Sequence, residues 1–326
     1  MFNNFINIHD ITTIFKQGPK AFLKIFLKLL QGQQKRIQTV WSQTSSPPQN
    51  WWDIPAVRTR WNRLISGDPQ VDYCDYISRK YLSDRQALRA LSLGCGTGNK
   101  ELKWAETSKF NRIEAYDLSK PRITYANNVA KQKGLANIIN YKVDDIYKIE
   151  MREDYYDIVL GEQSLHHFSP LEKLFLRINR FLHPKGYFIV NEFVGPTRFQ
   201  WTDRQLEAIN GLLAALPHKY KRLFNSDAIK GKIYKRSRLD MILSDPSEAV
   251  ESSNIAPLLH KIFNVVEIKE YGGTILQMLF QGIAHNFLAK DIETQCLLNI
   301  CFEYENTLLK NGDIKSDFII AICKKK

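Results

Sequence analysis

Residues 90–101, ALSLGCGTGNKE, decide the fold of this chain. A short apolar run over 90–93 ends at three glycines, Gly94, Gly96 and Gly98, and helix-compatible residues follow them. Glycine has no Cβ, so the backbone there can turn sharply and let a ligand lie against it. The free N–H groups of a helix start add a partial positive charge at the same place. The stretch therefore predicts a buried strand, a tight turn and a helix that bind a nucleotide-like cofactor.

The spacing of the glycines separates two classes of cofactor. The NAD pattern is G-x-G-x-x-G, whereas here the third glycine comes one residue early and Asn99 stands where that pattern has glycine. The turn instead resembles motif I of the class I S-adenosylmethionine (SAM) methyltransferases, (V/L)-L-(D/E)-(L/V)-G-x-G-x-G. Ser92 departs from that motif, which often has an acid there. The resemblance implies that the turn contacts SAM through Gly94, Cys95, Gly96 and Gly98.

Two further segments extend the resemblance to the nucleoside part of SAM. Residues 112–119 predict a second strand with Asp117 at its tip, where an acid suits two ribose hydroxyls, and Leu118 can pack on the adenine. The family also has an acid after its third strand that meets the adenine amino group. Asp145 fits that position best because the apolar Ile146 follows it, and Asp144 is the alternative.

The fourth and fifth strands complete the pattern. Residues 156–168 resemble the fourth strand and the active-site loop, where Glu162 and Gln163 suit contacts to the methionine moiety or to the acceptor. Residues 181–192 resemble the "L-K-P-G-G" turn and the fifth strand. The resemblance is close over roughly 80–195 and implies a SAM-dependent enzyme with a Rossmann-like α/β fold. We expect a seven-stranded sheet with an antiparallel last strand, helices on both faces, N-terminal helices and helical lid insertions.

The remaining sequence predicts decoration around this core, since 326 residues exceed the ~250–300 at which a single core usually stops growing. Arg58 and Arg60, in the aromatic-rich segment before the core, could meet a carboxylate or face water. The last helical insertion could build substrate pocket or a homodimer surface. The predicted organisation is a basic amphipathic helix region (1–42), a linker (43–50), a helical cap (51–82), the SAM-binding core (83–198), a helical lid (199–262) and the end of the core with a helical insertion (263–326).

The N-terminal helix, Pro19 to Gly32, carries Lys20, Lys24 and Lys28 on one face and apolar side chains on the rest. It can pack on the domain as a cap, which we favour, or lie on an anionic membrane surface as a peripheral contact. It does not read as a signal peptide, and no run is long and apolar enough to span a bilayer.

Composition points to a cytoplasmic, globular protein. The five cysteines are odd in number and form no C-x-x-C pair, which disfavours a disulfide framework or a zinc site and favours a reducing cytosol. The net charge is +12, but the basic residues are spread along the chain. A nucleic-acid partner is therefore not expected from charge alone.

The chemistry of SAM leaves the protein mainly to orient an acceptor, with a general base where the acceptor is a hydroxyl. That base should lie on the loops after the fourth and fifth strands. His167 is the preferred candidate because Leu165 and Phe168 look like packing residues, His166 is the alternative, and either could instead be structural. Glu192, at the tip of the fifth strand, would bind a polar or cationic acceptor.

Several acceptor classes are disfavoured by what the active-site loop lacks. It has no N/D-P-P-Y/F motif for amino methylation, no Pro-Cys nucleophile for cytosine C5, and the sequence shows no metal-ligand constellation of the catechol type. A small-molecule acceptor remains, methylated at oxygen in preference to nitrogen or carbon, as in enzymes of secondary metabolism. An RNA or protein methyltransferase and a non-catalytic scaffold with a SAM-type fold are the alternatives.

Overall fold

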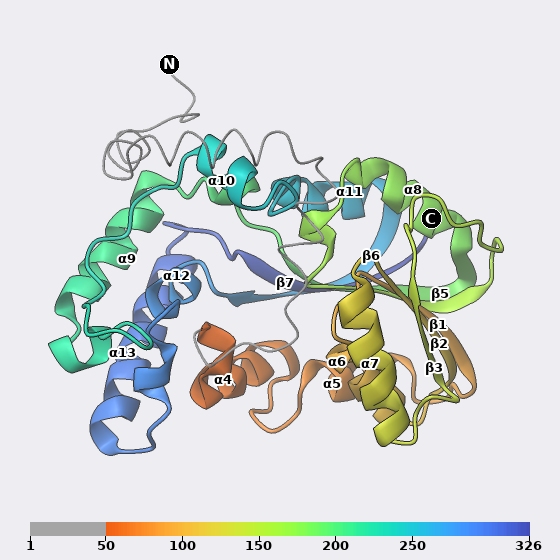
Figure 1. Cartoon of the computed structure of the whole chain (residues 1–326), viewed down its shortest axis with the longest axis horizontal. Helices are drawn as coiled ribbons and strands as arrows, with labels where there is room; N and C mark the ends of the chain where they lie inside the picture. The colour runs from red at the N-terminus through yellow and green to blue at the C-terminus, as the bar shows by residue number, and fades with distance from the viewer. Residues whose placement is uncertain (1–49) are drawn as a thin grey trace.

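A seven-stranded sheet forms the centre of the computed structural model, which describes residues 50–326 (Figure 1). The strand order is β3-β2-β1-β4-β5-β7-β6, with β7 antiparallel to both of its neighbours and the first five strands parallel. This confirms the expected fold class. The predicted N-terminal helix lies outside the described residues. The strands are β1 (Leu88–Leu93), β2 (Phe110–Asp117), β3 (Ile139–Val143), β4 (Tyr156–Glu162), β5 (Leu182–Phe193), β6 (Phe263–Gly272) and β7 (Phe318–Lys325).

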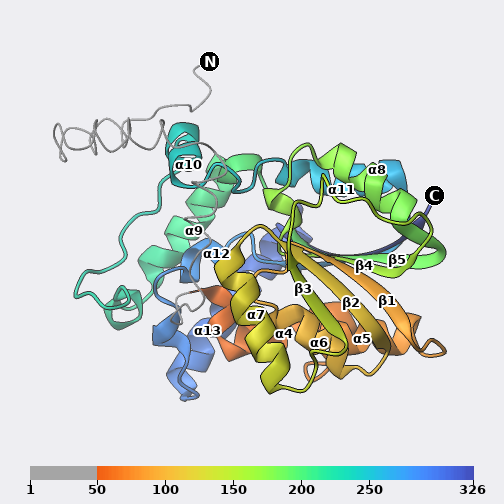
Figure 2. The same cartoon turned by 45° about the vertical axis from the view of Figure 1, so that its right-hand side comes forward.

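Helices cover both faces of the sheet (Figures 1 and 2). One face is covered by α4 (Pro55–Ser66), α5 (Tyr73–Tyr81), α6 (Asn99–Glu106) and α7 (Lys120–Gln132), and the other by α8 (Leu171–Phe181) and α11 (Ile255–Ile262). Alternate strand residues serve the two layers, as the period of two in a strand requires. Ile158 and Leu160 of β4 belong to the hydrophobic core under α4, α5, α6 and α7, whereas Val159 belongs to the core under α8 and α11.

The insertion after β5 is helical at both ends. Helix α9 (Asp203–Ala215) is capped by Thr202, whose hydroxyl accepts the N–H of Gln205 in a capping box. Helix α10 (Arg238–Ser244) follows, but the intervening residues 222–237 contain no helix. The later insertion supplies α12 (Leu276–Phe280) and α13 (Ile292–Lys310), and α12 packs against α9. Within residues 50–326, no helix has the length and apolar character needed to cross a bilayer.

The cap before β1 is fastened by a buried ion pair. Arg60 of α4 lies 3.0 Å from Glu305 of α13, and both side chains are buried. Glu305 also accepts backbone N–H groups at the start of α12, from Gly273, Ile275 and Leu276. The sequence left open whether Arg58 or Arg60 meets a carboxylate; Arg60 does, whereas Arg58 is exposed.

Replacing Arg60 should therefore destabilise the fold. Arg60→Met leaves the Glu305 carboxylate buried without its cation, which typically costs about 3–5 kcal/mol. Arg58→Met is the matched control, because it removes the same group from an exposed position of the same helix and should change stability by less than about 0.5 kcal/mol. Urea unfolding of both variants measures the difference, and an equal, small change in both would contradict the role given to the pair.

Candidate active site

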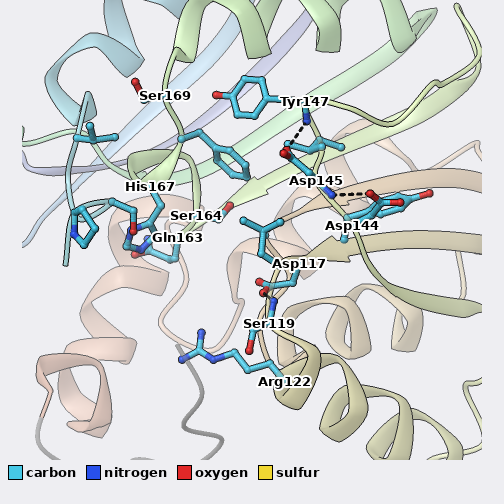
Figure 3. Close-up of a pocket in the computed structure, with 18 residues that line it drawn as sticks. Asp117, Ser119, Arg122, Asp144, Asp145, Tyr147, Gln163, Ser164, His167 and Ser169 are labelled. Carbon is cyan, nitrogen blue, oxygen red and sulfur yellow. Dashed lines mark hydrogen bonds between the residues drawn. The ribbon is translucent and has the colours of Figure 1, made fainter. Parts of the chain in front are cut away.

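A cavity of about 270 Å³ opens at the carboxyl ends of β1, β2, β3 and β4 (Figure 3). The sheet order reverses direction between β1 and β4, and ligands of open α/β sheets bind at such a switch point. Four loops of the core and one segment of the insertion line it. The lining residues are Gly94, 116–119, Arg122, 144–147, Gln163, Ser164, 167–169, Pro246, Ser247 and Val250.

The glycine turn approaches the cavity through Gly94. All three glycines have positive φ, at +64°, +56° and +81° for Gly94, Gly96 and Gly98. A Cβ on Gly94 would lie 2.8 Å from the Cβ of Ser164, and one on Gly98 would lie 2.6 Å from the Tyr141 hydroxyl, so both positions require glycine.

The other predicted turn residues support the turn and lie outside the cavity lining. The Cys95 side chain is buried in the core, and this burial raises the pKa of its thiol well above the usual value. Gly96 donates its N–H to Asp117, and Gly98 is the residue before the first turn of α6. Their predicted contact with the cofactor stays a prediction.

Asp117 points into the cavity from the tip of β2 (Figure 3). Its two oxygens accept the N–H groups of Gly96 at 2.9 Å and Ser119 at 2.7 Å. These bonds hold the carboxylate rigidly, and the remaining lone pairs can accept hydrogen bonds from a pair of hydroxyls. Leu118 stands beside it on the cavity wall.

The acids after β3 both reach the cavity. The Asp144 carboxylate accepts the N–H of Asp145 at 2.8 Å, and that of Asp145 accepts the N–H of Tyr147 at 3.0 Å (Figure 3). Ile146, which follows them, is buried and also lines the cavity wall. The geometry thus leaves open which acid meets an adenine. Tyr147 and Arg122 were missed by the sequence reasoning, although each lies within a few residues of a predicted site residue.

Two buried acids lie under the glycine turn. Glu162, which ends β4, accepts the Trp104 indole N–H at 2.9 Å and does not line the cavity; burial raises the pKa of its carboxyl. Glu101 of α6 accepts the hydroxyl of Ser92 at 2.5 Å, and burial raises the pKa of its carboxyl to about 7. Motif I often has an acid at position 92. Here Glu101, from the helix that follows the turn, brings a carboxylate into contact with the side chain at that position. Gln163, next to Glu162, lines the cavity as expected of a contact residue.

Glu192 stands behind the histidine loop rather than in the cavity. Its side chain is fully buried and accepts the backbone N–H groups of Ser164, Leu165 and Phe193. It also lies 2.6 Å from Nδ1 of His166. Because both oxygens are engaged in this way, the geometry favours a positioning role over the predicted contact with the acceptor.

The two histidines have opposite environments. Burial alone would lower the pKa of His166, but the charges of Glu192 and Glu248 outweigh it and raise that pKa above its usual value. For His167, burial and the neighbouring His166 charge lower the pKa well below 6.5. Of the two rings, only that of His167 lines the cavity (Figure 3), and its Nδ1 lies 3.4 Å from the Ser247 hydroxyl.

A segment of the insertion, residues 245–252, covers the histidine end of the cavity, and we call it the lid segment. It is held to the core by the N–H of Val250, which donates to the His166 carbonyl at 2.9 Å, and by Ser252, which donates to the Gly195 carbonyl at 2.9 Å. Its lining residues Pro246 and Ser247 were not predicted as site residues. They lie about 80 residues downstream of the loop they contact, so no local pattern announces them.

Comparison with known proteins places the chain among methyltransferases. A family model described as a methyltransferase domain matches residues 84–261. Malonyl-[acyl-carrier protein] O-methyltransferase from Bacillus cytotoxicus is 27% identical over 159 residues, which cover 46% of this chain and 54% of that protein. Sterol 24-C-methyltransferase from Candida albicans is 26% identical over 148 residues, 44% of this chain and 39% of that protein. The matches thus span about half or less of these curated relatives.

A solved structure also aligns along most of the chain. Geranyl diphosphate C-methyltransferase from Streptomyces coelicolor A3(2) is 11% identical, with a TM-score of 0.49, and the alignment covers 91% of this chain and 98% of that one.

The position of Asp117 predicts its effect on cofactor affinity. Asp117→Ala removes the carboxylate expected to bind the ribose, and should weaken binding of S-adenosylhomocysteine about 10- to 100-fold, as for the loss of hydrogen bonds to a charged group. Calorimetric titration measures this, with NADH as a ligand that should not bind. Asp84→Ala, an exposed aspartate that lines no part of the cavity, is the matched control. Equal affinity in the two variants would remove Asp117 from the cofactor site.

Proposed function

The chain belongs to the class I SAM-dependent methyltransferases, whose domain model covers more than half of it, and we propose that it methylates a small organic acceptor, at oxygen in preference to nitrogen or carbon. The observation that carries this proposal is the arrangement of one cavity. Asp117 stands on its nucleoside side and His167 on the side covered by the lid segment.

The residues around the cavity fit SAM. Gly94 leaves the space that a side chain would fill, Asp117 offers a fixed carboxylate for the ribose, and Ile146 offers an apolar wall beside two acids for the adenine. When bound, SAM supplies an activated methyl group on a positively charged sulfonium, which becomes a neutral thioether on transfer. Gln163, near the glycine turn, would contact the methionine part.

The lid segment supports a small acceptor. Pro246, Ser247 and Val250 form the wall opposite the core loops, next to His167. An acceptor held between this wall and the catalytic loop is oriented by side chains on both sides, which is the main contribution the protein has to make to the transfer. A covered space of this kind suits a small molecule better than a nucleic-acid strand.

His167 is placed to take the proton from an acceptor hydroxyl. Burial and the neighbouring His166 lower its pKa, so the ring is in the neutral form that can accept a proton, although the lowered pKa also makes it a weaker base. His166 has a raised pKa and is held by Glu192, so it is better suited to fixing the loop than to exchanging protons with an acceptor. We therefore assign the base to His167 and the positioning roles to His166 and Glu192.

Transfer of a labelled methyl group tests the proposed reaction. The protein is incubated with methyl-tritiated SAM and, separately, with a panel of phenols, carboxylic acids, sugars and amines, with total RNA, and with a protein extract. Label is expected in a hydroxyl-bearing small molecule and should be lost with Asp117→Ala, which lowers occupancy by cofactor. Label found only in RNA or protein would overturn the proposal, and so would SAM binding without transfer to any acceptor.

His167→Ala should separate catalysis from cofactor binding. Loss of a general base typically lowers turnover by about 10²–10⁴-fold, whereas affinity for S-adenosylhomocysteine should stay within about threefold because the cofactor contacts remain. In the unmodified chain, turnover should stay level as the pH falls from about 8 to 6.5, because the lowered pKa keeps the ring neutral there. His218→Ala, at an exposed position of the insertion, is the control. Unchanged turnover in His167→Ala would remove the base from this residue.

A further inference from the structure

Three side chains of the metal-ligating kind converge where the lid segment meets the histidine loop. His166 and His167 come from the loop after β4, and Glu248 comes from the lid segment; one ligand atom from each lies within 4.8 Å of the other two. We propose that His166, His167 and Glu248 bind a single divalent transition-metal ion of the Zn²⁺ type. Nothing in the sequence indicates this site, because Glu248 is far from the histidines along the chain.

The separation of the His166 and Glu248 atoms fits a shared ion. Nε2 of His166 lies 3.7 Å from Oε1 of Glu248, which is longer than a hydrogen bond. Two ligands that are each about 2.1 Å from a zinc ion in tetrahedral geometry lie about 3.4 Å apart. These two atoms are therefore close to the spacing that a common ion requires, and all three ligand atoms lie within 4.8 Å of one another.

Glu192 prepares His166 for this role. Its carboxylate lies 2.6 Å from Nδ1 of His166 and is fixed by three backbone N–H groups. With the Nδ1 proton donated to Glu192, Nε2 faces Glu248, and an ion that binds Nε2 displaces the second ring proton. Metal-binding histidines almost always donate their second nitrogen to a carboxylate or carbonyl in this way, which fixes the tautomer and strengthens the ligand.

Two carboxylates face the cluster, and cations lie near it as well, since the charges of Lys100 and Arg122 act on His167. Within residues 50–326, His166 is the ion-pair partner of both Glu192 and Glu248, so one ring faces two carboxylates. Arg198 donates to the backbone carbonyl of Glu248 and Arg236 pairs with Asp240, and the charges of both arginines also act on the Glu248 carboxylate. A divalent ion held by the three side chains would add its charge beside the two carboxylates and displace the proton that His166 carries.

The donor set also selects the class of ion. Two imidazoles and one carboxylate suit Zn²⁺ or Co²⁺, whereas Mg²⁺ and Ca²⁺ prefer an all-oxygen shell. Because His167 lines the cavity, a fourth position on the ion would face the space beside the lid segment. A His167 ring that coordinates an ion has no lone pair left for a proton, so a bound ion prevents His167 from acting as the general base. This consequence for turnover rests on the proposed function; binding of the ion does not.

Cobalt titration of the full-length protein tests the site without cofactor or acceptor. After removal of metals with a chelator, Co²⁺ should produce visible d–d absorption that saturates at one equivalent, Zn²⁺ should abolish it, and Mg²⁺ should have no effect. Glu248→Gln should weaken binding by about tenfold or more. Glu207→Gln makes the same chemical change on the exposed surface of α9, outside the cluster, and should bind as the unmodified chain does.

The outcomes are separable. Equal Co²⁺ affinity in Glu248→Gln and Glu207→Gln would overturn the site. If Glu248→Gln does not fold, His167→Ala replaces it, since that ring lies on the cavity wall, and it should lose the ion to the same extent. One equivalent of Zn²⁺ should lower turnover about tenfold or more, as expected when a base is removed, and a chelator should restore it. Unchanged turnover with the ion bound would remove His167 either from the ligands or from the role of base, and Co²⁺ titration of His167→Ala decides which. If the protein transferred no methyl group to any acceptor, the proposed function would be wrong. The Co²⁺ titration would still test the metal site, because it needs neither cofactor nor acceptor.

Discussion

The buried carboxylate of Glu192 is the interaction on which the arrangement of the site depends. Removing a carboxylate from water is costly unless its oxygens are fully hydrogen-bonded. Here Ser164, Leu165 and Phe193 donate their backbone N–H groups and His166 supplies a ring nitrogen, so the tip of β5 and the loop after β4 are joined at one point. This fixes the histidine loop before any ligand is present, and preorganised groups do not have to reorganise during reaction.

The same loop packs against the glycine turn. Ser164 donates its hydroxyl to the Leu93 carbonyl at 2.6 Å, and its Cβ occupies the space that a side chain at Gly94 would need. Gly94 is therefore required by packing between two loops. The glycine turn and the histidine loop are consequently packed directly against each other at the edge of the cavity.

The sequence predicted the features that are local and missed those that are not. The glycine turn, Asp117 and the histidine loop each follow directly from a strand, and strand ends of a parallel sheet meet at one edge, so their convergence could be expected. Glu192 was predicted to meet the acceptor because it ends a strand, but burial and the backbone donors around it, which no local pattern shows, place it behind the loop. The positions of Glu101, Ser247 and Glu248 near the site depend on which helix or insertion packs against which loop, and the local sequence does not show this. The predicted domain boundaries, the cofactor contacts of single residues and the N-terminal helix stay predictions.

The contacts of the lid segment link the acceptor side to the state of the histidines. Ser247 and Glu248 approach the two rings from the insertion, whereas Glu192 holds His166 from the core. Movement of the lid segment away from the loop would separate Glu248 from His166 and would leave that ring with one carboxylate instead of two. An ion shared by His166, His167 and Glu248 would oppose the same movement, because it binds the lid segment to the loop. If both proposals hold, movement of the lid segment away from the loop and occupancy by the ion oppose one another, and each weakens the other by the same free energy.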